Sequence, residues 1–198
     1  MPRPSSKLNV NEIFYSIQGE GKHAGLPAVF VRLAGCGMGC AWCDTKYAQK
    51  ITARLTPAAI LARAGKYPAK AVIITGGEPA EQDILPLIKL FAARGWQVHL
   101  ETNGARDIDT SLIYCTTASP KKNASAALLD KADVIKLVVE RKTTKKEILK
   151  YKKYAPKACV YLQPEGSKQE NINKCLKLIK QNPWLKLSLQ LHKILKIK

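Results

Sequence analysis

Residues 28–43 read AVFVRLAGCGMGCAWC, a β-branched apolar run that leads directly into a glycine-rich loop with three cysteines. The run at 28–33 predicts a buried strand, and similar runs separated by helical patterns are typical of parallel strands with crossover helices. The other predicted strands are 71–75, 98–102, 112–116, 134–139, 159–163 and, as a further candidate, 187–190. About six parallel strands are too few to close an eight-stranded barrel. The sequence therefore predicts an α/β fold of the open, partial (β/α) barrel type.

The segments with helical patterns lie between the predicted strands, as this alternation requires. Thr56 is a typical N-cap residue, and Pro57 follows it at the first helical position. An apolar helical pattern covers residues 83–94 and ends before Gly95, and the lysine-rich segment 141–157 also reads as helical. Because no linker, repeat or low-complexity tract divides the chain, residues 1–198 are expected to form a single domain.

Polar motifs follow the ends of several predicted strands. In α/β sheets and barrels, this edge is where ligands bind. The motifs are the cysteine loop from Cys36, GGEP at 76–79, ETNG at 101–104, SPK at 119–121 and QPE at 163–165. Five such motifs at one edge predict a single active site.

The charge balance raises the question of a nucleic-acid partner. The chain has 33 Lys and Arg against 15 Asp and Glu, a formal net charge of +18. Lysine predominates and no aromatic-interleaved basic stripe occurs, so a solvated lysine-rich helix face at 141–157 is the plainer interpretation. No apolar run of 18 residues and no signal-like N-terminus are present, so a soluble cytoplasmic protein without a membrane partner is expected.

The cysteine loop offers three thiolates in a CxxxCxxC spacing, Cys36, Cys40 and Cys43. Structural zinc usually takes four ligands, and the nearest upstream histidine, His23, is thirteen residues before Cys36. A four-iron four-sulfur cluster held by three cysteines would keep one iron free for a ligand. The cluster is favoured here, with zinc or unliganded thiols as alternatives. The remaining cysteines are expected to pack in the core: Cys115, Cys159 and Cys175.

Taken together, the CxxxCxxC loop and GGEP at 76–79 resemble the radical S-adenosylmethionine (SAM) superfamily. More narrowly, EIFYSIQGEG at 12–21 and GLPAVFVRLAGC at 25–36 resemble the 7-carboxy-7-deazaguanine synthase family. The motifs at 101–104 and 119–121, with LSLQLHK at 187–193, extend the resemblance over almost the whole chain.

The resemblance implies a lyase that contracts the ring of 6-carboxy-5,6,7,8-tetrahydropterin to 7-carboxy-7-deazaguanine and releases ammonia, on the route to queuosine and related deazaguanines. The implied cofactors are a [4Fe–4S] cluster, SAM that is reused after each turnover, and Mg²⁺. The implied partners are the small pterin substrate, a reductant such as flavodoxin or ferredoxin, and a second copy in a homodimer. A glycyl-radical-enzyme activase and an RNA-binding or RNA-modifying radical SAM protein are the alternatives.

The resemblance also implies roles for individual residues. Cys36, Cys40 and Cys43 would hold the cluster, and Thr45 would bind Mg²⁺ unless its hydroxyl caps a helix. SAM would be bound by Ala41, Trp42, Cys43, Gly77, Glu78, Glu101, Ser119, Pro120, Lys121, Gln163, Pro164, Glu165 and Gly166. Substrate would be bound by Ile17, Gln18, Gly19, Arg32, Thr75 and the terminal carboxylate of Lys198. No protein residue is assigned as an acid or base.

Two positions need comment. Arg32 lies in an apolar strand, where a planar guanidinium could bind the substrate carboxylate through two hydrogen bonds, and a solvent-facing strand arginine is the alternative. Leu191 stands where the family often has threonine, between Gln190 and His192. The hydroxyl is lost, so no role is expected for the side chain at 191.

Overall fold

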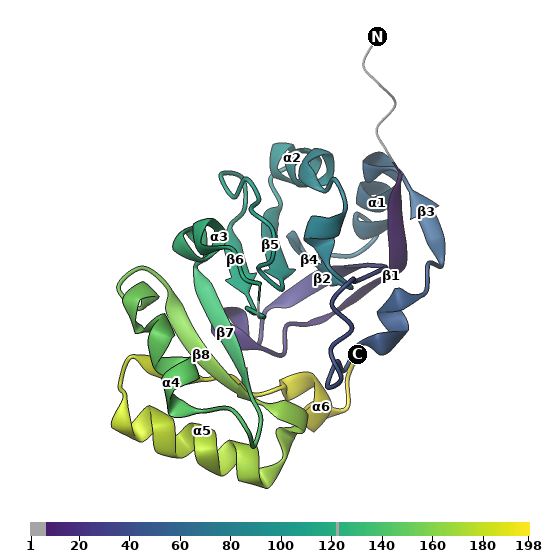
Figure 1. Ribbon diagram of the computed structural model, residues 1–198. Helices are drawn as coiled ribbons and strands as arrows, with labels where there is room; N and C mark the ends of the chain where they lie inside the picture. Colours follow the sequence, from purple (N-terminus) through teal and green to yellow (C-terminus); the bar gives the residue numbers. More distant parts are fainter. Residues whose placement is uncertain (1–6, 122) are drawn as a thin grey trace.

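The computed structural model describes residues 7–121 and 123–198. Within them, nine strands form one sheet in the order β3-β1-β2-β4-β5-β6-β7-β8-β9. From β2 to β9 each neighbouring pair is parallel, whereas β1 is antiparallel to both β2 and β3. Figure 1 shows the sheet curving as an open arc with helices around its outside. The strands are β1 Leu8–Ile17, β2 Pro27–Leu33, β3 Ala53–Leu55, β4 Ala71–Gly76, β5 Gln97–Thr102, β6 Cys115–Ala118, β7 Val134–Val139, β8 Cys159–Pro164 and β9 Leu185–Leu187.

The helices pack mainly on the outer face of the sheet. Thr56 caps the first of them, because its side chain accepts a hydrogen bond from the Ala59 amide at 3.2 Å. The α-helices are α1 Pro57–Ala64, α2 Leu85–Ala93, α3 Ala126–Lys131, α4 Lys145–Leu149, α5 Gln169–Gln181 and α6 Leu191–Leu195. The 3₁₀ helices are η1 Gly21–His23, η2 Lys46–Gln49, η3 Pro79–Glu81, η4 Lys150–Tyr154 and η5 Glu165–Ser167.

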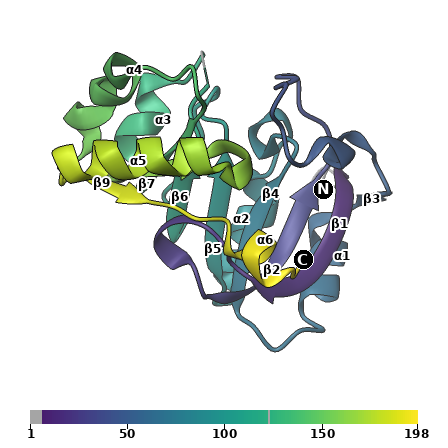
Figure 2. The same cartoon turned by 90° about the horizontal axis from the view of Figure 1, so that it is seen from below.

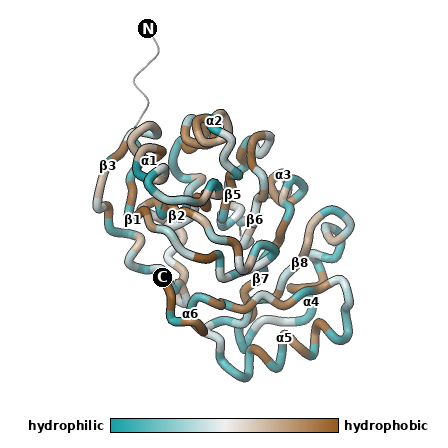
Figure 3. The backbone as a smooth tube through the Cα atoms, turned by 180° about the vertical axis from the view of Figure 1, so that it is seen from behind, coloured by the Kyte–Doolittle hydropathy of each residue, from teal (hydrophilic) through white to brown (hydrophobic). Residues whose placement is uncertain are grey.

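Two large apolar clusters hold these helices against the sheet. One joins α1 and α2 to β1, β2, β4 and β5 through residues such as Phe91 and Leu100, which are fully buried. The other joins α4 and α5 to β7, β8 and β9, and includes the buried Cys175. Figure 3 shows hydrophobic colouring along the strands, with hydrophilic residues alternating along α5. Because the apolar contacts are concentrated on the outer face, the inner face can carry polar side chains.

The open, mostly parallel α/β fold predicted from the sequence is confirmed. The parallel part has seven strands rather than about six (β2, β4, β5, β6, β7, β8 and β9). Two predicted boundaries are wrong. Residues 112–114 form a turn before β6, with Leu112 and Tyr114 exposed, so apolar composition alone was misleading there. The last strand is Leu185–Leu187, because the polar residues Ser188 and Gln190 turn inward and are buried.

Two other segments differ from expectation. The long strand β1 was not predicted, because its LNVNEIFYSI sequence mixes polar and apolar residues without clear alternation. The lysine-rich segment forms a shorter helix than predicted: a capping box between Thr144 and Glu147 starts α4, which tightens into η4. Its lysines are exposed, in line with a solvated face.

The C-terminal segment returns to the start of the chain. Figure 2 shows α6 beside β1 and β2, with the C-terminus close to them. Leu191 donates its amide hydrogen to the Gly19 carbonyl at 2.9 Å, and the Gly21 amide donates to Ser188 Oγ at 3.0 Å. These bonds fasten the loop after β1 to the end of the chain. No helix in the described ranges has the length and apolarity to cross a membrane.

Candidate active site

A cavity of about 340 Å³ opens at the carboxyl ends of the parallel strands. It is lined by the ends of β2, β4, β5 and β8, by the cysteine loop, by the loop after β1 and by α6. Every residue predicted to bind the cluster, Mg²⁺ or substrate lines this cavity. So does every residue predicted to bind SAM, apart from Ala41 and Pro120 among the described positions. The structure thus brings together motifs that are far apart in sequence.

The cysteine loop presents its three thiols to the cavity. Cys36, Cys40 and Cys43 are half-buried and unbridged. The Gln49 side chain fastens the loop by accepting from the Cys36 amide at 3.2 Å and donating to the Cys36 carbonyl at 2.9 Å, while Glu81 accepts from the next amide. Burial, with a smaller contribution from the Glu81 carboxylate, raises the pKa of the Cys36 thiol. A cationic metal cluster would supply the positive charge that these thiolates need. Three thiols from one loop in the cavity wall therefore fit a [4Fe–4S] cluster with one iron left open.

The glycine pair that follows β4 meets the protein backbone. A Cβ on Gly77 would lie 1.8 Å from the Gly35 carbonyl oxygen, and one on Gly76, where φ is +114°, would lie 2.3 Å from the Leu33 carbonyl oxygen. The close approach that requires glycine is thus to the chain entering the cysteine loop. The Glu78 amide also donates to the Gly35 carbonyl at 2.7 Å. This contact fixes the cysteine loop against β4.

The Glu78 carboxylate is fully used within the protein. It accepts from the Thr102 hydroxyl at 2.6 Å, from the Asn103 amide at 2.6 Å and from the Ala80 amide at 2.9 Å, and the residue is 1% exposed. Burial raises the pKa of this carboxyl even though these donors oppose the shift. Glu78 therefore ties the ends of β4 and β5 together.

A corner with two cationic side chains lies at the end of β2. Arg32 donates from Nε to Glu12 Oε1 at 2.8 Å, and Lys198 Nζ lies 2.5 Å from Glu12 Oε2. The Arg32 guanidinium also stacks over Phe14 and Tyr47, each with 5.6 Å to the ring centroid. With its side chain 13% exposed, Arg32 faces the cavity, so the solvent-facing alternative is wrong. Two cationic side chains, Arg32 and Lys198, therefore share the Glu12 carboxylate at the cavity wall.

A buried network of opposite sign lies across the cavity and was missed from the sequence. Lys136 Nζ lies 2.5 Å from Glu20 Oε2 and 2.9 Å from Glu101 Oε2, and Gln18 donates to Glu101 Oε1 at 3.3 Å. Burial alone would lower the pKa of Lys136, but the two carboxylates outweigh it and raise that pKa. Burial raises the pKa of Glu101 despite Lys136. The signal that could have found Lys136 is a lone lysine in the apolar run VIKLVV.

The C-terminal motif completes this network. Gln190 donates to Glu20 Oε1 and to Asp44 Oδ2, each at 2.8 Å, and Lys193 donates to Asp44 at 2.9 Å. A Cβ on Gly19 would lie 2.5 Å from His192 Nδ1, so only glycine fits there. Leu191 stands where the family often has threonine, and its main-chain amide donates to the Gly19 carbonyl in the loop after β1.

Other predicted ligands lie around the cysteine loop. Thr45 precedes η2 without capping it through its side chain, and its Oγ1 is 3.6 Å from Cys43 Sγ. The capping alternative thus has no support. Lys121 Nζ lies 4.6 Å from the Trp42 ring centroid and donates to the Ser119 carbonyl and hydroxyl oxygens at 2.9 Å. Burial lowers the pKa of Lys121.

The carboxyl end of β8 forms another wall. Gln163 accepts from the Ser188 hydroxyl at 3.2 Å, and Pro164, Glu165 and Gly166 follow it along the cavity. Thr75 lines the cavity from β4, and Ile17 does so from the end of β1.

Comparison with known proteins agrees with this geometry. The radical SAM superfamily model matches residues 30–156. A 7-carboxy-7-deazaguanine synthase from Bacteroides thetaiotaomicron is 37% identical over 189 residues, which cover 96% of this chain and 98% of that protein. The synthase of Escherichia coli strain K12 is 33% identical over 220 residues, covering 95% and 98%. The crystal structure of QueE from Escherichia coli matches with a TM-score of 0.79 and 31% identity over 93% of this chain and 94% of that one. This chain therefore belongs to the 7-carboxy-7-deazaguanine synthase family of radical SAM enzymes.

Proposed function

We propose that this chain converts 6-carboxy-5,6,7,8-tetrahydropterin to 7-carboxy-7-deazaguanine and ammonia, the activity that its family is named for. The observation that carries the proposal is one cavity that combines three cysteine thiols, a buried arginine and the loop after β1. A glycyl-radical activase would need to admit a protein loop, whereas this cavity is bordered by the C-terminal helix α6. The substrate is a flat pterin that carries a carboxylate. It suits a cavity lined by Arg32 on one side and by the network around Lys136 on the other.

The cofactors are those of the radical SAM superfamily, a [4Fe–4S] cluster and SAM. When bound, they supply a carbon-centred radical that removes a hydrogen atom from the substrate. Cys36, Cys40 and Cys43 would hold the cluster. Lys121 would bind the SAM carboxylate, because burial beside Trp42 keeps its ammonium in the cavity wall. The main chain at 76–78 and the residues at 163–166 would hold the rest of SAM.

The substrate carboxylate would be bound by Arg32. Glu12 holds its Nε, and none of the described residues accepts a hydrogen bond from its two terminal nitrogens. Both terminal nitrogens are therefore available to one ligand. A guanidinium that donates two parallel N–H hydrogen bonds matches the two oxygens of a carboxylate. The hydroxyl of Ser16 donates to the main-chain oxygen of Lys198, so the end of the chain lies at the same corner.

The opposite edge of the pterin carries N–H donors and would face the acidic network. Glu20 and Glu101 hold two carboxylates against the single positive charge of Lys136. Each of their four carboxylate oxygens already accepts one hydrogen bond, so the pterin N–H groups would donate to the second lone pairs of these oxygens. Arg32 projects from β2 and Lys136 from β7, so the two charged groups would orient the pterin across the cavity. The raised pKa of Glu101 makes this carboxyl the group in the network best suited to hold a proton.

Magnesium is the third cofactor of the family, and Thr45 is its proposed protein ligand. The Thr45 hydroxyl lies at the cavity wall and is free of a capping role. Mg²⁺ prefers oxygen ligands and commonly keeps several waters or substrate oxygens, so a single hydroxyl from the protein is sufficient. The ion would position the substrate next to the cluster.

The test is anaerobic incubation of cluster-reconstituted protein with SAM, a reductant, Mg²⁺ and carboxytetrahydropterin. The expected result is 7-carboxy-7-deazaguanine and one equivalent of ammonia, with SAM recovered intact. Cys40→Ala should give no product, whereas Cys159→Ala, a thiol on β8 outside the cavity, should remain active. SAM cleavage without deazaguanine would reject the assigned substrate.

Residues 1–198 would form one domain, since a continuous sheet runs from Leu8 to Leu187. The protein would act in the cytoplasm, because all six cysteines are free and an exposed cluster requires a reducing compartment. An external carrier such as flavodoxin or ferredoxin would supply electrons, and the functional unit would be a homodimer. Size measurement in solution and activity with each carrier test these points.

A further inference from the structure

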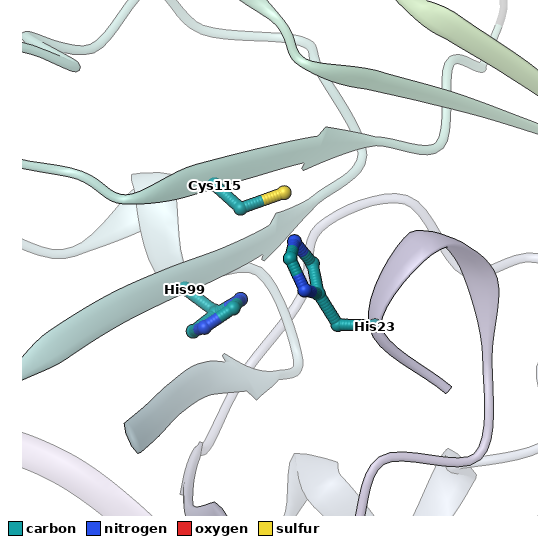
Figure 4. Close-up of side chains that lie close together, drawn as sticks. All are labelled: His23, His99 and Cys115. Carbon is teal, nitrogen blue, oxygen red and sulfur yellow. The ribbon is translucent and has the colours of Figure 1, made fainter. Parts of the chain in front are cut away.

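A second group of metal-ligating side chains lies away from the cysteine loop. One ligand atom each from His23, His99 and Cys115 lies within 4.8 Å of the other two. Figure 4 shows the three side chains directed toward one another from three different segments. The synthase activity described above makes no use of this group.

The fold places the group near the amino ends of the strands, below the active site. His99 pairs with Cys115 in register across β5 and β6, and His23 ends η1 in the loop between β1 and β2. Along β5, Val98 and Leu100 pack in the outer cluster, so His99 and Glu101 share the inner face. Two residues of strand span about 7 Å, so the group lies one layer of side chains beneath Glu101.

Two nitrogens in this group have no hydrogen-bond partner among the described residues. His23 Nε2 and His99 Nε2 are both buried, and His99 as a whole is 5% exposed. Burying such a nitrogen without a partner is costly, so its occurrence in two adjacent rings requires an explanation. The rings meet edge to face with centroids 4.8 Å apart, and Tyr114 lies 5.3 Å from His99 on the solvent side.

The surrounding charges favour a cation. Asp133 is fixed beside Cys115 by accepting from the Thr116 amide at 2.8 Å, and its charge acts on both histidines and on the thiol. Lys22 opposes it in part. A divalent ion would face two negative charges, the Cys115 thiolate and Asp133, and one positive charge, Lys22.

We propose that His23, His99 and Cys115 form a zinc site that fastens the loop between β1 and β2 to the sheet. Two imidazoles and a thiolate suit Zn²⁺ and exclude Mg²⁺, which takes oxygen ligands. In a tetrahedral zinc site the ligand atoms lie about 3.3 to 3.7 Å apart, so a small inward movement from the present spacing is needed. Binding forms two Zn–N bonds and one Zn–S bond, a water molecule fills the fourth position of the tetrahedron, and the thiol proton is released to bulk water.

The site would act on the substrate pocket through this loop. The same loop carries Gln18 and Gly19, which line the cavity, and its own turn is closed by bonds between Gln18 and both Gly25 and Leu26. Holding His23 would limit the movement of Gln18 relative to Glu101. The metal is therefore structural, and these three residues are positioning residues.

The first test measures zinc in the cluster-loaded protein after equilibration with Zn²⁺ and removal of weakly held metal. One zinc per chain is expected in addition to the cluster iron. Cys115→Ala and His23→Gln should lose it, and His23→Gln lies in a surface loop, where folding is least at risk. Cys159→Ala is the matched control, since it removes a half-buried thiol from β8. Equal zinc in all four proteins, or none in wild type, would overturn the proposal.

The second test identifies the ligands and the effect on the loop. X-ray absorption at the zinc edge should show one sulfur at about 2.3 Å and nitrogens at about 2.0 to 2.1 Å. Three sulfurs would place the zinc in the CxxxCxxC loop and overturn the assignment. Hydrogen exchange of residues 18–26 should slow on zinc addition at least several-fold in wild type and remain unchanged in His23→Gln. Equal slowing in both proteins would also contradict the proposal.

Discussion

Replacing Lys136 by methionine removes the cation that pairs with both Glu20 and Glu101, and the cost follows from its surroundings. Lys136 contacts two carboxylates at 2.5 and 2.9 Å, and its side chain is 8% exposed. Breaking a buried ion pair by removing one partner costs about 3 to 5 kcal/mol, because the remaining charge is left unpaired. For a chain of this size, that corresponds to a fall in melting temperature of about 6 to 20 °C.

The loss should depend on pH in a defined direction. The pKa of Glu101 is raised by burial even with Lys136 present, and it should rise further in Lys136→Met. A carboxyl whose folded pKa exceeds its unfolded value favours folding below the unfolded pKa, and this contribution is lost as the pH rises through the folded pKa. The deficit of the variant relative to wild type should therefore be largest near pH 8 and shrink as the pH falls toward about 4 to 5.

Urea unfolding of anaerobic protein at several pH values measures this deficit. Lys131→Met is the matched control, because its ion pair with Asp107 is 45% and 48% exposed and should contribute at most about 1 kcal/mol. Adding Glu101→Gln to Lys136→Met should recover part of the loss by removing one unpaired charge. If Lys136→Met cost no more than Lys131→Met at pH 8, the reasoning about the network would be refuted.

Four further changes test the cavity. Cys40→Ala should abolish iron binding and SAM cleavage, whereas Cys175→Ala should keep both, as iron analysis will show. Arg32→Lys should raise KM for the pterin about tenfold or more, because an ammonium cannot make two parallel hydrogen bonds; unchanged steady-state kinetics would remove Arg32 from the substrate site. Thr45→Ala should lose its response to magnesium with iron content unchanged, while Thr45→Ser should keep most of it; identical magnesium curves would leave Thr45 without a metal role. Gly19→Ala should displace α6 and reduce turnover at full cluster content, and normal turnover would contradict the tight fit there.

A feature of the fold or site could be predicted from the sequence when the residues that define it are neighbours in the chain. The strands at 71–75 and 134–139 are continuous apolar runs, and the cysteine spacing lies within one loop, so both were found directly. The network around Lys136 could not be found in the same way. Its partner Glu20 lies 116 positions away and Glu101 lies 35 away, so the charge has a partner only after the sheet has formed. The same applies to the contact of His192 with Gly19.

Strand β5 shows why this fold tolerates so many buried charges. Its outward side chains, Val98 and Leu100, are buried among apolar neighbours, while the inward pair is polar, with His99 buried and Glu101 half-buried. Side chains alternate along a strand with a period of two, so a shift of one residue would drive both polar groups into the apolar outer cluster. That penalty fixes the register as firmly as the apolar contacts do. The inner charges therefore serve both the chemistry of the cavity and the alignment of the strands, and the helices on the outer face provide the burial that offsets their cost.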